Sequence, residues 1–136
     1  MCAPTSWVRF EVNTSASLRV NFIRTGAVLG FLAVALGAFG AHALKTRLTP
    51  EALQIWHTAV LYHMIHAVVL LALGLYAKSA GVKVNAGAFL FLAGIVLFSG
   101  SLYALALTDI KPLGAITPLG GMCFLAGWAF LIFKGV

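Results

Sequence analysis

Charged residues are scarce in this chain of 136 residues, and acidic residues are fewer than basic ones. Only 9% of the residues carry a charge, and Asp and Glu together account for three of them. Soluble domains carry charge on roughly a quarter of their residues. Because 62% of the residues are hydrophobic, the composition excludes a soluble globular domain and indicates an integral membrane protein.

The residues of common catalytic and metal sites are also rare. The two cysteines, Cys2 and Cys123, lie too far apart for a CxxC metal or redox motif. No carboxylate lies inside an apolar segment, no Gly-rich phosphate loop is present, and no nucleophile has a visible base and orienting group. The net charge of +6 comes from scattered residues, not from a basic stripe interleaved with aromatics. We therefore expect no enzyme, no metal site and no nucleic-acid partner.

Four apolar segments are long enough to cross a hydrocarbon core as helices, which takes about 20 residues. We predict helices over residues 25–44, 50–77, 84–107 and 117–134. Short connections make sequential helices antiparallel neighbours. The expected fold is therefore all-α, an integral membrane four-helix bundle with an up-down-up-down order.

The same segments define the domain organisation. Residues 1–22 show no sustained period and are predicted to form a flexible amino-terminal tail. Residues 23–136 form one transmembrane domain. Within it, Thr49 followed by Pro50 is typical of a helix start, and Gly81 is typical of a helix end.

The distribution of basic residues predicts the orientation. Six lie at the end of the bundle that holds both termini, and three lie at the opposite end together with two of the three acids. The first group comprises Arg9, Arg19, Arg24, Lys78, Lys83 and Lys134, and the second Lys45, Arg47 and Lys111, beside Glu51 and Asp109. The positive-inside rule then places both termini in the cytoplasm.

Polar side chains inside the predicted spans mark the candidate site, because ionisable groups at membrane depth are costly and mark functional sites by default. His63, His66 and Tyr62 fall on one face of the helix over residues 50–77. His57 falls on the opposite face, which is apolar, includes Val60 and Leu71, and is expected to meet lipid. The remaining candidates are His42, Ser99, Ser101, Tyr103 and Thr117. Connectivity predicts that these candidates share one half of the membrane, the outer leaflet, facing the bundle interior.

Three interpretations of this cluster stay open. It is a hydrogen-bonded polar layer that fixes helix register, a small-ligand or proton site, or a ligand set for a metal or haem. We expect no cofactor, with haem b held by His42 and His66 as the alternative.

Small residues recur at spacings that let helices approach closely. The candidates for helix packing are Gly26, Gly30, Gly37, Gly94, Gly120 and Gly127. The spacing does not distinguish packing within one chain from packing between chains.

Several motifs together resemble a known family. They are Gly37-Ala38-Phe39-Gly40-Ala41-His42, Tyr62-His63-x-x-His66, Leu97-Phe98-Ser99-Gly100-Ser101-Leu102-Tyr103, and Thr117-Pro118-Leu119-Gly120-Gly121 followed by Phe124-Leu125-Ala126-Gly127-Trp128. They are similar to the transmembrane protein 256 family, whose bacterial members form the YgdD and YwdK group of small inner-membrane proteins. The resemblance implies four helices and no established activity, and it puts more weight on His42 and His66 than on His63 and His57.

Two functional hypotheses follow. The first is a non-enzymatic accessory or scaffold protein of the bacterial inner membrane, which self-associates or joins a larger membrane complex through its glycine-rich helix faces. The alternative is a small transporter, or a protein that binds a ligand or proton, using an outer-leaflet pocket of His, Ser and Tyr side chains.

Overall fold

The computed structural model describes residues 14–83 and 86–135, with the backbone alone for residues 14–21. All regular structure in these residues is helical. Five α-helices are present: α1 (Thr14–Phe39), α2 (Pro50–Ala80), α3 (Ala86–Gly94), α4 (Gly100–Thr108) and α5 (Thr117–Lys134). A π-helical turn, Gly40–Leu44, extends α1, a second one, Ile95–Ser99, joins α3 to α4, and a 3₁₀ helix, Lys111–Ala115, precedes α5.

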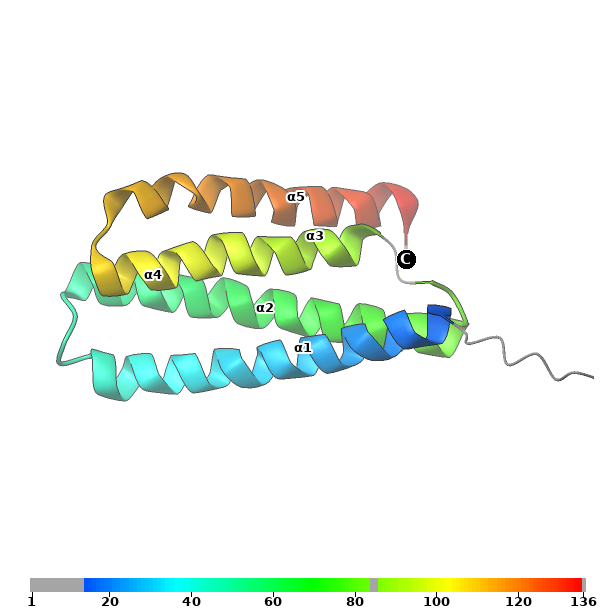
Figure 1. The fold of residues 1–136 in the computed structure, drawn as a ribbon, viewed down its shortest axis with the longest axis horizontal. Helices are drawn as coiled ribbons and strands as arrows, with labels where there is room; N and C mark the ends of the chain where they lie inside the picture. The colour runs from blue at the N-terminus through cyan, green and yellow to red at the C-terminus, as the bar shows by residue number, and fades with distance from the viewer. Residues whose placement is uncertain (1–13, 84–85, 136) are drawn as a thin grey trace, which may run out of the picture.

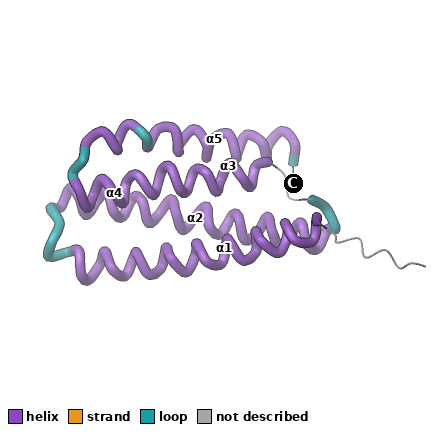
Figure 2. The backbone as a smooth tube through the Cα atoms, viewed as in Figure 1, coloured by secondary structure: helices purple, strands orange, loops and turns teal. Residues whose placement is uncertain are grey.

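These elements make four spans long and apolar enough to cross a membrane, which confirms the predicted fold class. We call Ala86–Thr108 the third span, since α3, the π-helical turn and α4 follow one another without a break. The spans run antiparallel in chain order, with α1 against α2, α2 against the third span, and the third span against α5 (Figures 1 and 2). The start of α1 and the end of α5 lie at one end of the molecule, which we call the terminal end (Figure 1). The connections over residues 45–49 and 109–116 lie at the opposite end, which we call the loop end (Figure 1).

The first helix begins earlier than the sequence analysis predicted. α1 starts at Thr14, so residues 14–22 of the predicted flexible tail are helical in the structure, and residues 1–13 of that prediction lie outside the described residues. Because this stretch is rich in polar residues, the apolar pattern did not indicate that the helix begins before the apolar run. The other three spans have bounds within a few residues of the predicted ones.

Local sequence explains where α2 begins and ends. The hydroxyl of Thr49 accepts a hydrogen bond from the Ala52 backbone amide at 3.2 Å, and Pro50 occupies the first turn. At the other end, Gly81 adopts a left-handed conformation with φ of 69°, which glycine tolerates without steric cost. Both predicted signals therefore act as expected.

The inner and outer helices differ in burial. Of the residues in the most apolar part of each span, 39% are buried in α2 and 33% in the third span, against 17% in the first and fourth spans. The sequence analysis assigned one apolar face of α2 to lipid, and this was wrong in part. Leu71 and Val60 on that face pack against Gly26 and Gly37 of α1, because α2 is enclosed from two sides.

The α1–α2 interface brings backbone close to backbone. A Cβ atom at Gly26 would lie 2.6 Å from the Leu71 amide nitrogen, and one at Gly74 would lie 2.8 Å from the Ile23 amide nitrogen. Gly37 has a looser contact, 3.3 Å from its added Cβ to Val60 Cγ1. Any side chain larger than hydrogen at Gly26 or Gly74 would push the two helices apart.

At the interface between the third span and α5, aromatic rings pack against glycines. A Cβ atom at Gly94 would lie 2.4 Å from the Phe124 ring, and one at Gly127 would lie 2.8 Å from the Phe91 ring. Gly120 lies against backbone, 2.3 Å from its added Cβ to the Phe98 nitrogen. Gly30 differs from the other packing candidates, because no atom lies within 4 Å of a Cβ placed there, so it makes no close contact within the described part of the chain.

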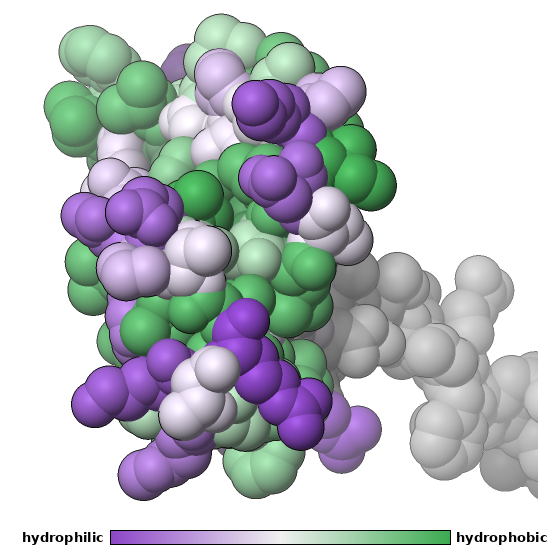
Figure 3. Space-filling view, turned by 90° about the vertical axis from the view of Figure 1, so that its left-hand side faces the viewer, coloured by the Kyte–Doolittle hydropathy of each residue, from purple (hydrophilic) through white to green (hydrophobic). Residues whose placement is uncertain are grey.

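Charged side chains gather at the two ends of the spans. The loop end shows hydrophilic patches separated by apolar side chains (Figure 3), and Lys45, Arg47, Glu51, Asp109 and Lys111 are exposed there. Arg24, Lys78 and Lys134 are exposed toward the other end of the molecule. This arrangement suits a protein whose two ends face water and whose length lies in a bilayer.

Candidate functional site

Each neighbouring pair of spans is joined by a hydrogen bond that involves a side chain. The Trp56 indole donates to the carbonyl oxygen of Leu36 at 2.9 Å, which links α2 to α1. The Nδ1 atom of His63 is hydrogen bonded to the Tyr103 hydroxyl at 3.2 Å, which links α2 to the third span. Ser101 Oγ and Thr117 Oγ1 lie 2.8 Å apart and link the third span to α5. We call these bonds, with the His66–Trp128 bond below, the interhelical polar layer.

His66 connects α2 to α5 and uses both of its ring nitrogens. Its Nδ1–H donates to the Tyr62 carbonyl oxygen at 2.8 Å, and its Nε2 accepts from the Trp128 indole N–H at 3.3 Å. A carbonyl only accepts and an indole only donates, so these partners fix the tautomer with hydrogen on Nδ1. The imidazole also stacks on the Phe124 ring, with centroids 3.6 Å apart and planes 8° from parallel. His66 is therefore held rigidly.

Two buried polar atoms have no hydrogen-bond partner within the described residues, His63 Nε2 and Ser99 Oγ. Both side chains are buried, Ser99 completely. Ser99 lies one helical turn from Tyr103, the partner of His63, so the two residues share a face of the third span. Native proteins satisfy most buried polar atoms, so this region of the interior differs from the rest of the polar layer.

The interhelical polar layer extends from the loop end to the middle of the molecule. The His63–Tyr103 and Ser101–Thr117 bonds lie in the half of the molecule nearer the loop end. His66 lies deeper, about 24 Å along α2 from Pro50, near the middle of a helix about 46 Å long. Its bond to Trp128 is therefore the deepest of the layer.

Two of the predicted site residues, His42 and Tyr62, lie away from the interior, and so does His57, which was not one of them. His42 is exposed in the π-helical turn at the loop end, so it does not face His66 as haem ligation by that pair requires. His57 is exposed, as expected. Tyr62 is 40% exposed and stands at the rim of the bundle, not inside it as predicted. Among the described residues, no group of three His, Cys, Asp or Glu side chains is arranged to hold a metal.

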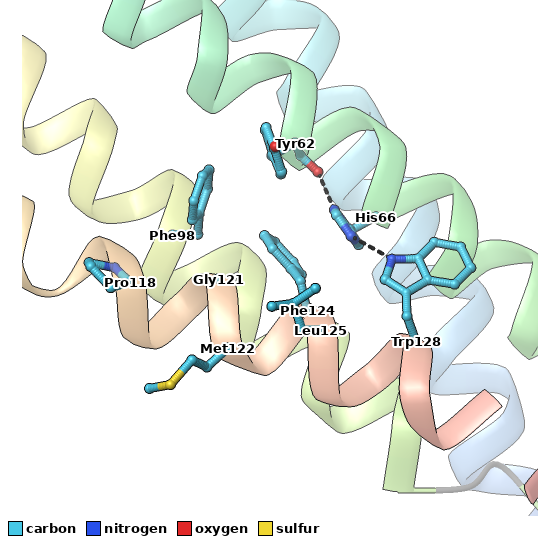
Figure 4. Close-up of a pocket in the computed structure, with 9 residues that line it drawn as sticks. All are labelled: Tyr62, His66, Phe98, Pro118, Gly121, Met122, Phe124, Leu125 and Trp128. Atoms are coloured by element: carbon cyan, nitrogen blue, oxygen red, sulfur yellow. Dashed lines mark hydrogen bonds between the residues drawn. The ribbon is translucent and has the colours of Figure 1, made fainter. Parts of the chain in front are cut away.

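A groove of about 440 Å³ opens on the side of the molecule where α5 approaches α2 (Figure 4). The rings of Tyr62, Phe98, Phe124 and Trp128 border it, and His66 lies between α2 and α5. The remaining lining residues come from α5: Pro118, Gly121, Met122 and Leu125. The groove exists because α5 packs on the third span and reaches α2 mainly through side chains, which leaves the gap between the two helices incompletely filled.

The sequence analysis did not include Trp56, Phe124 and Trp128 among the site residues. A signal was available, since a buried indole N–H needs an acceptor, and a tryptophan inside a span must find one on a neighbouring helix. The glycine spacing gave a second signal. Gly94 faces the Phe124 ring, so small residues on one helix indicated the position of large rings on the next.

Comparison with known proteins identifies the family. A family model described as "Protein of unknown function (DUF423)" matches residues 36–121. The UPF0382 membrane protein YwdK of Bacillus subtilis (strain 168) is 50% identical to this chain over 85% of its length and 95% of the relative. The chain belongs to the DUF423 family. Membership confirms the resemblance to the YwdK group that the motifs indicated.

Further members of the DUF423 family come from staphylococci. The UPF0382 membrane protein SSP2132 of Staphylococcus saprophyticus is 47% identical over 82% of this chain and 92% of its own. The UPF0382 membrane protein SAB0533 of Staphylococcus aureus (strain bovine RF122 / ET3-1) is 46% identical over 82% of this chain and 91% of its own. No solved structure matches the chain. The relatives agree with the four apolar spans in making this a membrane protein.

Proposed function

We propose that this DUF423 protein is a non-enzymatic accessory or scaffold protein of the bacterial inner membrane, with both termini in the cytoplasm. The observation that supports this role most strongly is the interhelical polar layer. His66, Tyr103, Ser101 and Thr117 are engaged in hydrogen bonds between spans, so they hold the helices in register and are not free to act on a substrate. No carboxylate approaches this layer in the described part of the chain.

The outer helices provide surface for association. α1 is buried mainly on its α2 side and exposes a broad apolar face that includes Phe31, 73% exposed, and Val34. Gly30 lies on α1 with open space beside it, where the backbone of another helix could approach. Self-association, or attachment to a larger membrane complex, through this face is the form of the accessory role we propose.

The mass of the protein in mild detergent and in lipid nanodiscs tests this proposal. We expect a species larger than one chain, and we expect Gly30→Leu to reduce it to the monomer while the thermal stability of the monomer is unchanged. Gly100→Leu, at an exposed glycine of α4 with open space beside it, is the control for added bulk on another face. A strictly monomeric wild-type protein with no co-purifying partner would contradict the proposal.

A proton-binding or small-ligand role is the second candidate, and one observation favours it. His63 Nε2 and Ser99 Oγ are buried polar atoms without partners in the described residues, as expected for a site that exchanges a proton or a water molecule. Under this candidate, protein in vesicles dissipates an imposed pH gradient faster than empty vesicles, and His63→Leu abolishes the difference. His57→Leu, an exposed histidine of the same helix, is the matched control. Equal rates for wild type and His63→Leu would eliminate this candidate.

A further inference from the structure

The groove between α2 and α5 has the dimensions of a single hydrocarbon chain. It extends along α5 from Pro118 to Trp128, which is about 15 Å at the rise of an α-helix. Its volume of about 440 Å³ spread over that length gives a channel about 6 Å across. A transmembrane helix is about 10 Å in diameter with its side chains, so it could place only side chains in this open groove and would not fill its length. An extended acyl chain would fill it.

The position of the groove matches one leaflet. Pro118 is at the start of α5, at the loop end, and Trp128 lies ten residues further along the same helix. The groove therefore begins at one membrane boundary and ends about 15 Å deeper, and half of a hydrocarbon core about 30 Å thick is the same distance. A lipid of the loop-end leaflet would place one chain along this whole length without changing its depth.

The chemistry of the lining favours an apolar occupant. The polar atoms nearest the groove are already bonded, since His66 uses both ring nitrogens and Trp128 donates its indole hydrogen to His66. The rest of the lining is aromatic or aliphatic, with the Tyr62 hydroxyl as the exception. At the loop end, the exposed Lys111 precedes α5, where its ammonium group can pair with a lipid phosphate.

We propose that the groove between α2 and α5 is a binding site for one acyl chain of a phospholipid from the loop-end leaflet, with the phosphate on the side of Lys111. The rings of Tyr62, Phe98 and Phe124 lie along the groove and would contact the bound chain. This proposal does not depend on the accessory role, since a retained lipid is compatible with either candidate function.

Gly121 makes the proposal directly testable. A Cβ added at Gly121 would lie 3.8 Å from Phe98 Cδ2, an ordinary contact, so a larger side chain is accommodated by filling the groove. Gly100 is the matched control, because a Cβ there has no atom within 4 Å and Gly100 does not line the groove. The variants Gly121→Leu and Gly100→Leu thus add the same bulk inside and outside the site.

The experiment uses the full chain in vesicles that contain phospholipids with a photoreactive diazirine, either at the chain end or near the carbonyl. In wild type we expect the chain-end probe to label Phe124 and Trp128, and the carbonyl-proximal probe to label Pro118 and Gly121, above the labelling of Phe31 on α1. Gly121→Leu should reduce groove labelling to the Phe31 level, and Gly100→Leu should leave it unchanged. If Gly121→Leu does not fold, Leu125→Trp, which covers the mouth from an exposed position, replaces it.

Several results would overturn the proposal. Wild-type labelling in the groove no higher than at Phe31 would show ordinary surrounding lipid only, and so would labelling that Gly121→Leu does not change. Labelling that rises when the protein is diluted into more lipid would show that a second copy of the chain occupies the groove. Loss of phospholipid labelling when excess free fatty acid is added would identify a fatty acid as the occupant instead.

Discussion

The two interfaces that flank the inner helices are built on different principles. Between α1 and α2, glycines Gly26 and Gly74 face the backbone of the opposite helix, and only Gly40, at the loop end, faces a ring, that of Trp56. Between the third span and α5, Gly94 and Gly127 face aromatic rings, and Gly120 faces the Phe98 backbone. One hydrogen bond accompanies each interface, from Trp56 to Leu36 in the first and between Ser101 and Thr117 in the second.

This difference determines where a groove can form. Backbone contact closes the α1–α2 interface along much of its length, because the helices themselves touch. α5 packs on the third span through two ring contacts and one backbone contact and reaches α2 mainly through side chains, and the space that remains between α5 and α2 is the groove lined by Tyr62 and Trp128. The side that carries α5 is therefore the side available to a small ligand, and the side that carries α1 is available to a partner helix.

The largest expected effect comes from adding one methyl group to each interface. Gly26→Ala and Gly94→Ala should each lower the free energy of unfolding in detergent by about 1–3 kcal/mol, the usual cost of overpacking. Their Cβ atoms would lie within 2.6 Å of the Leu71 backbone and 2.4 Å of the Phe124 ring, respectively. Gly30→Ala, in open space, should instead be neutral or gain up to about 1 kcal/mol from helix propensity.

Double variants then test whether each added methyl group would strike the backbone or a ring of the opposite helix. Phe124→Leu removes the ring that Gly94→Ala would strike, so the pair should recover stability relative to the sum of the single effects, with a coupling of about 0.5–3 kcal/mol. Leu71→Ala leaves the backbone atoms that Gly26→Ala would strike, so that pair should be additive. Thermal unfolding of the four single and two double variants measures both couplings, and equal couplings would remove the distinction between the interfaces.

A smaller effect is expected from the two tryptophans that donate across these interfaces. Trp56 is 2% exposed and Trp128 is 42% exposed, so the indole that Trp56→Phe removes has more buried packing contacts to lose, in addition to its hydrogen bond, than the indole that Trp128→Phe removes. Interhelical hydrogen bonds in membranes average about 0.6 kcal/mol, with about 1.7 kcal/mol as the upper range. We expect Trp56→Phe near the upper value and Trp128→Phe near the average. The reverse order in unfolding measurements would show that the α5 side depends more on hydrogen bonding.

Much of this architecture could be predicted from the sequence, because it depends on length, polarity and local caps. Four apolar runs separated by short connections permit few arrangements, and the Thr49 cap and the Gly81 termination act within one helical turn. The start of α1 could not be predicted, since its first turns are polar and carry no amphipathic signal. The partial enclosure of α2 was missed for another reason, because a helix with neighbours on two sides leaves no single lipid face.

The candidate site was harder to predict than the fold. The helical-wheel analysis of α2 correctly predicted that His63 and His66 face the interior. It could not show that His42 is exposed or that Tyr62 lies at the edge of the bundle. Those positions depend on the rotation and depth of neighbouring helices. The π-helical turn Ile95–Ser99 adds to the difficulty, because it changes the face that later residues of the third span present.

The smallest expected effect separates two serines of the third span and defines how far the α5 side depends on hydrogen bonds. Ser101 is bonded to Thr117 across the interface, so Ser101→Ala should cost about 0.6 kcal/mol. Ser99 is fully buried and its hydroxyl has no partner among the described residues, so Ser99→Ala removes a desolvated group and should be neutral or slightly stabilising. Both substitutions remove the same atom from the same helix, so unfolding in detergent compares them directly. If Ser99→Ala lowers the free energy of unfolding as much as Ser101→Ala does, the Ser99 hydroxyl has a partner, such as a water molecule shared with His63. That result would favour the proton-binding candidate.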